Sequence, residues 1–343
     1  MIGKSSGALV VMLLVLVGIG MSALMAADNQ PVPGYSPQQC DPATVVGHET
    51  CIKCHEAAMK QWMQTPHYRT FDALHRTPEA KQIADKMGLR SIKRNDTCVT
   101  CHYTRQVVGN RERVVAGVSC ESCHGGAKNW LDLHADYGGP NVTREMETAA
   151  HREQRLEASI AAGMNNPENL YLVARQCLSC HTVPDEKLVN VGGHKAGTDQ
   201  FELVAWSQGL VRHNFVRSGG ATNAVSSPER LRVMYVVGQM ADLEASLRAT
   251  AKATEMATYG QASAGRAARA KSRLWEVQRR IDHPLLGKAL DAVATLQLTL
   301  DNQQAMLAAA DQVAEAAYEF ATVDGSTLQA IDRLLPAANQ YKN

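Results

Sequence analysis

The sequence lacks an excess of charge of either sign. Lysine and arginine number 35 and aspartate and glutamate 34, so the formal net charge of the 343 residues is +1 at pH 7. Domains that bind nucleic acid usually carry a clear basic excess. The charge balance therefore argues against nucleic acid as a partner.

Cysteine is absent from the chain after residue 180. All nine cysteines lie before residue 181, whereas the region after Ser227 is rich in alanine, leucine, glutamine and charged residues. Such a change of composition indicates two parts with different cores. We predict a cysteine-bearing domain over residues 48–226 and an α-helical domain over residues 227–343.

Eight of the nine cysteines form four copies of a Cys-x-x-Cys-His motif. Two thiols three residues apart can reach the two vinyl groups of one porphyrin, and the following histidine can ligate its iron. A thioredoxin-like redox pair could explain one copy, and zinc held by two copies together could explain two. Neither explains a histidine after every copy, so the sequence predicts four covalently bound haem c groups, whose propionates would make the protein acidic. The copies are Cys51, Cys54 and His55; Cys98, Cys101 and His102; Cys120, Cys123 and His124; and Cys177, Cys180 and His181.

Eight of the 12 histidines lie outside the motifs and are available as second axial ligands. His67 is flanked by aromatic residues in WMQTPHYRTF, and His134 follows the third motif in NWLDLH, so we expect both to ligate haems attached elsewhere in the chain. His194 in GGHKAG and His213 in RHNF are further candidates, with a surface or hydrogen-bonding loop histidine as the alternative. The 13 methionines show no spacing that singles one out. The remaining histidines are not expected to be ligands: His48, His75, His151 and His283.

The N-terminus contains an apolar run over residues 7–27 that is preceded by a lysine. Such a run is typical of an export signal, and it is also long enough to span a bilayer as a retained anchor. We therefore expect residues 1–27 to be a signal peptide or an N-terminal anchor, and the folded part to be periplasmic or otherwise extracytoplasmic. The four prolines of residues 28–47 predict an extended linker, in which Cys40 is either a free thiol or half of an intermolecular disulfide.

The hydrophobic periodicity predicts a mainly α-helical, loop-rich fold. Ser227 followed by Pro228 is typical of an N-cap and first helical residue, and one apolar stripe follows them. We predict a tetrahaem cytochrome c domain with the haems as its core, followed by a C-terminal bundle or hairpin of long helices. Helices are expected over 56–64, 78–88, 144–163, 167–175, 262–281 and 285–320 and after Ser326, with a small hairpin around Gly109 and Asn110.

The order of the motifs resembles the tetrahaem cytochrome c-554 family of ammonia-oxidising bacteria, within the multihaem cytochromes that include hydroxylamine oxidoreductase and pentahaem nitrite reductase. The resembling segments are CIKCHEAAMKQWMQTPH, DTCVTCH, GVSCESCHGGAKNWLDLH and RQCLSCH. They lie within residues 47–215, and the helical tail is not covered.

The resemblance implies a pairing of ligands with haems. It places His134 on the haem of Cys51 and Cys54, His67 on the haem of Cys120 and Cys123, and His213 on the haem of Cys177 and Cys180. It also implies that the second haem lacks a sixth protein ligand. Because His194 is one histidine more than that pattern needs, we predict instead four bis-histidine haems, with His194 and His213 divided between the second and fourth.

Three functions follow from these expectations. The first is an exported electron carrier that passes electrons between redox proteins, such as other cytochromes or a membrane quinol-linked complex. The second is a redox enzyme acting on a small nitrogen compound, such as NO, hydroxylamine or nitrite, at an open haem. The third is a haem-bearing adaptor that assembles through its tail, for example as a homo-oligomer through residues 227–343. The alternative, which we prefer for the tail, is that it folds back on the haem domain. Residues 7–27 offer a membrane attachment in each case. We expect a carrier rather than an enzyme, because an iron that is already capped by imidazole binds small ligands weakly, and we predict no catalytic residue.

Overall fold

The computed structural model describes Met1, residues 40–198 and residues 200–342. Apart from Met1, the predicted signal peptide or anchor and residues 28–39 of the predicted linker lie outside the described residues. Within the described ranges, no helix is long and apolar enough to cross a membrane. All described residues from 40 onward belong to one compact unit, Gly34–Asn343.

Four helices carry the cysteine motifs: α1 (His48–Trp62), α4 (Asp96–His102), α5 (Cys120–His124) and α7 (Leu170–His181). Because the two cysteines of a motif are three residues apart, they lie on the same face of their helix. The last three of these helices end at the motif histidine, and the backbone of α1 leaves helical geometry at His55 (φ −117°, ψ 40°). Each motif histidine therefore lies at a helix end or kink.

Short elements connect the motif helices, and their boundaries follow local sequence signals. Thr65 and Thr77 accept hydrogen bonds from the backbone N–H groups of Tyr68 and Ala80, and a proline follows each threonine. A hydroxyl N-cap followed by proline is a favoured helix start. Further connecting helices lie later in the chain. These elements are α2 (Pro66–Ala73), α3 (Pro78–Lys86), α6 (Ala149–Ala161), α8 (Glu186–Asn190) and α9 (Leu203–Ser207).

The predicted hairpin is confirmed. Strand β1 (Thr104–Val108) pairs antiparallel with β2 (Arg111–Ala116), and Val108 lies opposite Arg111. Gly109, in the two-residue turn, has φ of +64°. Glycine adopts this left-handed conformation without a steric penalty, which explains its place in the tight turn.

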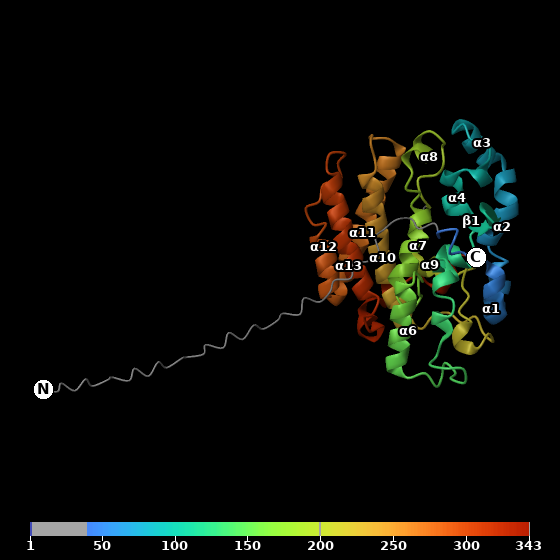
Figure 1. The fold of residues 1–343 in the computed structure, drawn as a ribbon. Helices are drawn as coiled ribbons and strands as arrows, with labels where there is room; N and C mark the ends of the chain where they lie inside the picture. The colour runs from blue at the N-terminus through green and yellow to red at the C-terminus, as the bar shows by residue number, and fades with distance from the viewer. Residues whose placement is uncertain (2–39, 199, 343) are drawn as a thin grey trace. The chain divides into compact units, whose positions relative to one another are not determined.

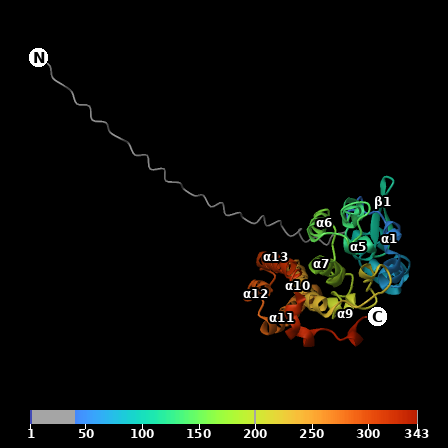
Figure 2. The same cartoon turned by 90° about the horizontal axis from the view of Figure 1, so that it is seen from below.

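The C-terminal part contains α10 (Pro228–Ala251), α11 (Thr258–Ile281), α12 (Pro284–Asp291) and α13 (Gln303–Phe320), followed by a 3₁₀ helix, Gly325–Leu334. Ser227 caps α10 as predicted, by accepting a hydrogen bond from the Arg230 N–H. Helix α10 packs against α11 and α13 and also against α7 and α9 (Figures 1 and 2). The mainly α-helical fold with a helical C-terminal part is confirmed. The proposed division at residues 226 and 227 stays a prediction.

The prediction of one apolar stripe on α10 is wrong. Almost every residue from Arg232 to Ala251 is buried, including Gln239, Asp242 and Glu244. The cause is that α10 has packing partners on several sides, so its polar side chains are enclosed together with its apolar ones. Tyr171 of α7 donates a hydrogen bond to Glu244 over 2.6 Å, which ties α10 to the last motif helix.

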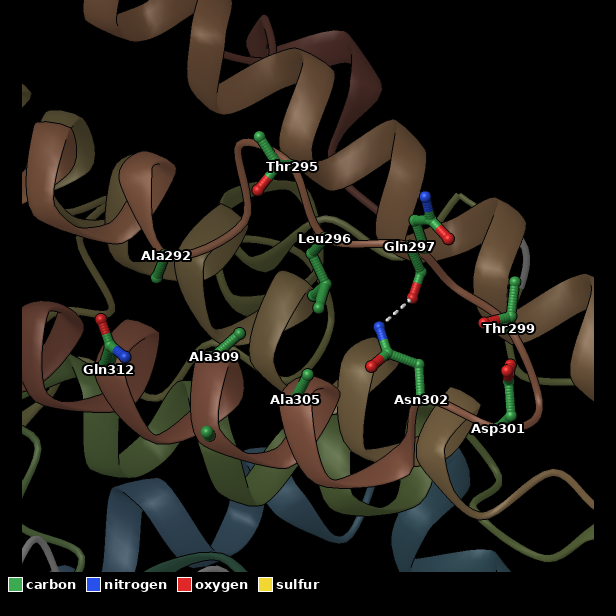
Figure 3. A pocket seen from close by; sticks show the side chains of 11 residues that line it. Ala292, Thr295, Leu296, Gln297, Thr299, Asp301, Asn302, Ala305, Ala309 and Gln312 are labelled. Atoms are coloured by element: carbon green, nitrogen blue, oxygen red, sulfur yellow. Dashed lines mark hydrogen bonds between the residues drawn. The ribbon is translucent and has the colours of Figure 1, made fainter.

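The prediction of one helix over 285–320 is also wrong. The chain leaves α12 after Asp291 and turns back through residues 292–302 into α13, which packs against α12. Most helical stability in proteins comes from packing an apolar face, and the fold back lets both helices bury theirs. An open pocket of about 530 Å³ lies between this connection and α13, and Asn302 donates a hydrogen bond to the Gln297 carbonyl at its rim (Figure 3). Its lining residues include no histidine or cysteine.

Candidate haem sites

Every motif histidine faces one other histidine ring. The paired rings come from segments far apart in the sequence, and the distances between ring centroids are nearly equal. The four pairs are His55 with His134 at 6.3 Å, His102 with His194 at 6.3 Å, His124 with His213 at 6.1 Å, and His181 with His67 at 6.2 Å.

This separation matches the span of a metal ion held between two imidazoles. A nitrogen–metal bond of about 2 Å on each side places the two ring centroids about 6 Å apart. Two imidazole rings stacked directly on each other would have their centroids closer together than about 6 Å. The pair of imidazoles and the two motif cysteines therefore fit an iron porphyrin attached at each motif.

The pairing differs in part from the one that the resemblance implies. His134 lies opposite His55, in agreement with it. His67 lies opposite His181 of the fourth motif rather than His124 of the third, and His213 lies opposite His124 rather than His181. The expectation that His213 serves the second or fourth site is therefore wrong. The physical reason is that α2 brings His67 to the end of α7, which leaves the third site open to the segment around His213.

Hydrogen bonds fix the orientation of several paired rings. In five of them Nδ1 lies within hydrogen-bonding distance of an oxygen, so Nε2 is the nitrogen that remains to face a metal. The partners are Leu131 O for His134 (2.5 Å), Thr198 Oγ1 for His181 (2.8 Å), Lys195 O for His194 (2.8 Å), Val211 O for His213 (2.7 Å) and Asn165 O for His124 (3.3 Å).

Burial keeps the motif histidines neutral. Desolvation lowers the pKa of His102 and His124 to about 4 and that of His181 to about 3. The neutral imidazole is the form that binds a metal. These side chains are therefore in the ligating form at neutral pH.

The four sites are neighbours in an order that differs from their order in the sequence. Cys51 of the first motif lies beside Cys120 of the third. Cys101 of the second motif lies beside Cys180 of the fourth in the same way. Burial and then the nearby Cys177 and Cys180 raise the pKa of Cys123, so the third and fourth motifs are also close. The spatial order is first, third, fourth, second.

Glu121, between the two cysteines of the third motif, joins that motif to the first. Its carboxylate accepts hydrogen bonds of 2.9 Å from the N–H groups of Val46, Gly47 and Ala127, and the residue is 1% exposed. Three donors satisfy the buried charge. Glu121 thereby fixes the segment that leads into α1 against the third motif.

An ion pair holds the backbone at His134. Arg155 of α6 donates two hydrogen bonds to Glu147, of 2.7 and 2.6 Å, and a third of 3.0 Å to the His134 carbonyl. The Arg155 hydrogen bond lowers the pKa of Glu147 to about 2. Arg155 is thus a positioning residue for the first site.

Unpartnered buried donors lie beside two of the histidine pairs. Among the described residues, the side-chain nitrogens Trp130 Nε1, Trp206 Nε1 and Arg266 Nη2 are buried without a hydrogen bond. The Trp130 ring lies 5.2 Å from that of His134, and the Trp206 ring lies 5.3 Å from that of His181. Buried donors normally have an acceptor. Haem propionates are acceptors of the right kind, so the donor set fits the group.

The four histidines that were not expected to be ligands have other surroundings. His48 lies against Trp62, His151 against Glu147 and His283 against Phe320, where its ring also caps α12. His75 Nδ1 is buried without a hydrogen bond in the described part of the chain. Sequence reasoning missed the supporting residues Glu121, Arg155 and Thr198. No local pattern marks them, because each acts on a segment distant in sequence.

Comparisons with known proteins agree with this chemistry. Residues 50–125 match the family model described as cytochrome c554 and c-prime. Cytochrome c-554 of Nitrosomonas europaea is 30% identical over 103 residues, which are 27% of this chain and 43% of that protein. The match thus spans less than half of the relative. No solved structure matches the chain.

These matches first indicate a class of protein. Over residues 50–125 the chain is similar to c-type cytochromes, a class that implies covalently bound haem c with iron. The particular relation is to cytochrome c-554, and the predicted resemblance to that family is confirmed for the part of the chain that carries the first three motifs.

Proposed function

We propose that the chain is an exported tetrahaem cytochrome c that passes electrons between redox partners along four closely spaced haems. The observation that carries the proposal is the set of four histidine pairs, one for each motif, with ring centroids 6.1–6.3 Å apart. Two imidazoles on each iron make a bis-histidine site, which has no position left for a substrate.

The haem supplies a reversible one-electron change at iron when it is bound. The chain supplies everything else that a carrier needs. The paired imidazoles would give a bound iron the same coordination in both oxidation states, and the hydrogen bonds to Nδ1 keep the rings from turning. Cysteines of the first and third, the third and fourth, and the fourth and second motifs lie close together, so the haems attached to them would be adjacent. Electrons would therefore follow the spatial order rather than the sequence order.

The enzyme hypothesis has less support. A redox enzyme for NO, hydroxylamine or nitrite needs an iron with an open position and a nearby proton donor. The second site is the one that the resemblance leaves without a sixth protein ligand. In this structure the ring centroid of His194 lies 6.3 Å from that of His102. This opposing ring supports a carrier.

Partners and location extend the same proposal. An export signal over residues 1–27 would place the haems in the periplasm or another extracytoplasmic compartment, with residues 7–27 as the membrane attachment if they are retained. Other cytochromes or a membrane quinol-linked complex are the proposed partners. The tail packs on α7 and α9, which favours a structural role for residues 227–343 over an adaptor that assembles homo-oligomers.

Two measurements test the proposal. Intact-mass spectrometry should give the polypeptide plus four haems, and three or fewer after confirmed maturation would contradict the tetrahaem assignment. Carbon monoxide added to the reduced protein should leave the Soret band unchanged. A stoichiometric shift of one haem would show an open iron and would favour the enzyme.

A further inference from the structure

The fourth haem site is built partly by the C-terminal helices, which lie outside the residues that match the family model. Arg266 of α11 donates hydrogen bonds to the carbonyls of His181 (3.1 Å) and Thr198 (3.2 Å). Thr198 in turn holds Nδ1 of His181 through its hydroxyl, over 2.8 Å. One arginine of the tail therefore fixes both the proximal histidine and the residue that orients it.

Asp242 of α10 fixes Arg266 in turn. Its carboxylate accepts a hydrogen bond of 2.5 Å from Arg266 Nε, and both side chains are nearly buried, at 11% and 8% exposed. Gly197, with φ of +88°, makes the approach possible, since a Cβ there would lie 3.1 Å from the His181 carbonyl oxygen and 3.2 Å from Arg266 Nη1. Asp242 and the two backbone carbonyls therefore hold the Arg266 guanidinium in one orientation.

One donor of this guanidinium has no acceptor. Within the described residues, Arg266 Nη2 is buried and makes no hydrogen bond, although Nε and Nη1 are both satisfied. An unmade hydrogen bond from a buried charged donor is costly. The Trp206 nitrogen, beside the same histidine, is also unpartnered. Two donors without acceptors at one histidine point to an anionic acceptor that belongs to the bound group.

We propose that Arg266 binds a propionate of the haem attached at Cys177 and Cys180, and that the Asp242–Arg266 pair sets the reduction potential of that haem. This inference rests on the proposed function, because it requires a haem at the fourth motif. A positive charge held beside the haem stabilises its reduced, more electron-rich form. Asp242 offsets part of that charge.

The test is a redox titration of the purified holoprotein followed by electron paramagnetic resonance. Arg266→Gln should lower the potential of one haem, and Asp242→Asn, which leaves the arginine charge without its counter-charge, should raise the potential of the same haem. If the two substitutions acted only through a loss of packing, the reduction potential of the haem would change in the same direction in both variants. Thr198→Val identifies which electron paramagnetic resonance signal belongs to the fourth haem. The change removes the hydrogen bond to His181 and should therefore alter the signal of that haem alone.

Controls separate the possible failures. Arg269→Gln, at an exposed position of α11, should leave all potentials unchanged. If Arg266→Gln does not fold, Asp242→Asn alone decides, and an unchanged or lowered potential overturns the proposal. A tryptic peptide containing Cys177 and Cys180 without haem would instead refute the haem at the fourth motif, and with it the proposed function.

Discussion

At the scale of single residues, the pairing of histidines follows a simple rule. Eight histidines form the four pairs. In chain order, the first of these eight faces the fifth, the second faces the sixth, the third faces the seventh and the fourth faces the eighth: His55 with His134, His67 with His181, His102 with His194, and His124 with His213. All eight could be selected from the sequence, four by motif and four by their surroundings. Their pairing could not, because it depends on how α2 and α7 pack rather than on any local pattern.

Replacement of His67 by glycine tests the pairing directly. The change should turn one low-spin haem into a high-spin haem, and this haem should be the fourth, since His67 faces His181. Electron paramagnetic resonance is the measurement, and the signal that disappears should be the one that Thr198→Val perturbs. His75→Ala, which has no motif histidine against its ring, is the control. Loss of a different signal would restore the pairing that the resemblance implies.

Glu121 tests the link between the first and third motifs. Glu121→Gln keeps the shape but removes the charge that accepts three backbone N–H groups, so we expect a loss of about 2 kcal/mol of unfolding free energy. Chemical denaturation of the holoprotein measures it. Glu79→Gln, on the first turn of α3, is the control and should change little. Equal effects of the two changes would show that the buried carboxylate does not stabilise the fold.

The ion pair of Glu147 and Arg155 predicts an acid-labile first site. The pKa of Glu147 in the folded protein is lowered to about 2 by Arg155, so its contribution is present above the unfolded value near 4.5 and is lost as pH falls toward 2. Denaturation curves at pH values across this window should show a steeper loss of stability for the natural protein than for Glu147→Gln. Parallel curves would contradict this role.

At the scale of elements, helix starts were predictable and helix surroundings were not. Ser227 and Pro228 mark the start of α10 because the cap is a local hydrogen bond. The burial of α10 on most sides depends on α7, α9, α11, α13 and the 3₁₀ helix Gly325–Leu334, and no periodicity within α10 records these partners. The break in the predicted helix over 285–320 has the same origin, since only tertiary packing favours the fold back of α13 on α12.

Gly238 of α10 shows how closely the elements pack. A Cβ at this position would lie 2.7 Å from Leu203 Cβ of α9, so Gly238→Ala should destabilise the protein by about 1–3 kcal/mol, although alanine is the better helix former. Thermal denaturation measures it. Gly265→Ala in α11 is the matched control, because its nearest neighbour is the flexible end of Arg269 at 3.4 Å, and it should be neutral or stabilising. A neutral Gly238→Ala would show that α9 can move away.

At the scale of the whole molecule, the tail is part of the structure that holds the haems. Helix α7 buries Leu172, Ala174 and Leu178, and α10 packs against this helix. A chain that ends at residue 226 should therefore expose an apolar surface and form aggregates or oligomers. Size-exclusion chromatography with light scattering measures this. A monodisperse short chain with an unchanged haem spectrum would show that the two parts fold independently, as the predicted domain boundary requires.

The ordered pairing of the histidines has a consequence for the lifetime of the folded state. An iron bound between two paired histidines would close the chain between them into a long loop. The first histidines of all four pairs precede the second histidines of all four, so each loop overlaps the other three in sequence. No loop can be opened without rearranging the segments that close the rest, so partial opening releases little chain entropy. Such a topology has a high contact order and forms slowly. With an iron bound at each of the four pairs, as we propose, the protein should therefore unfold slowly, because the four loops must open together rather than one at a time.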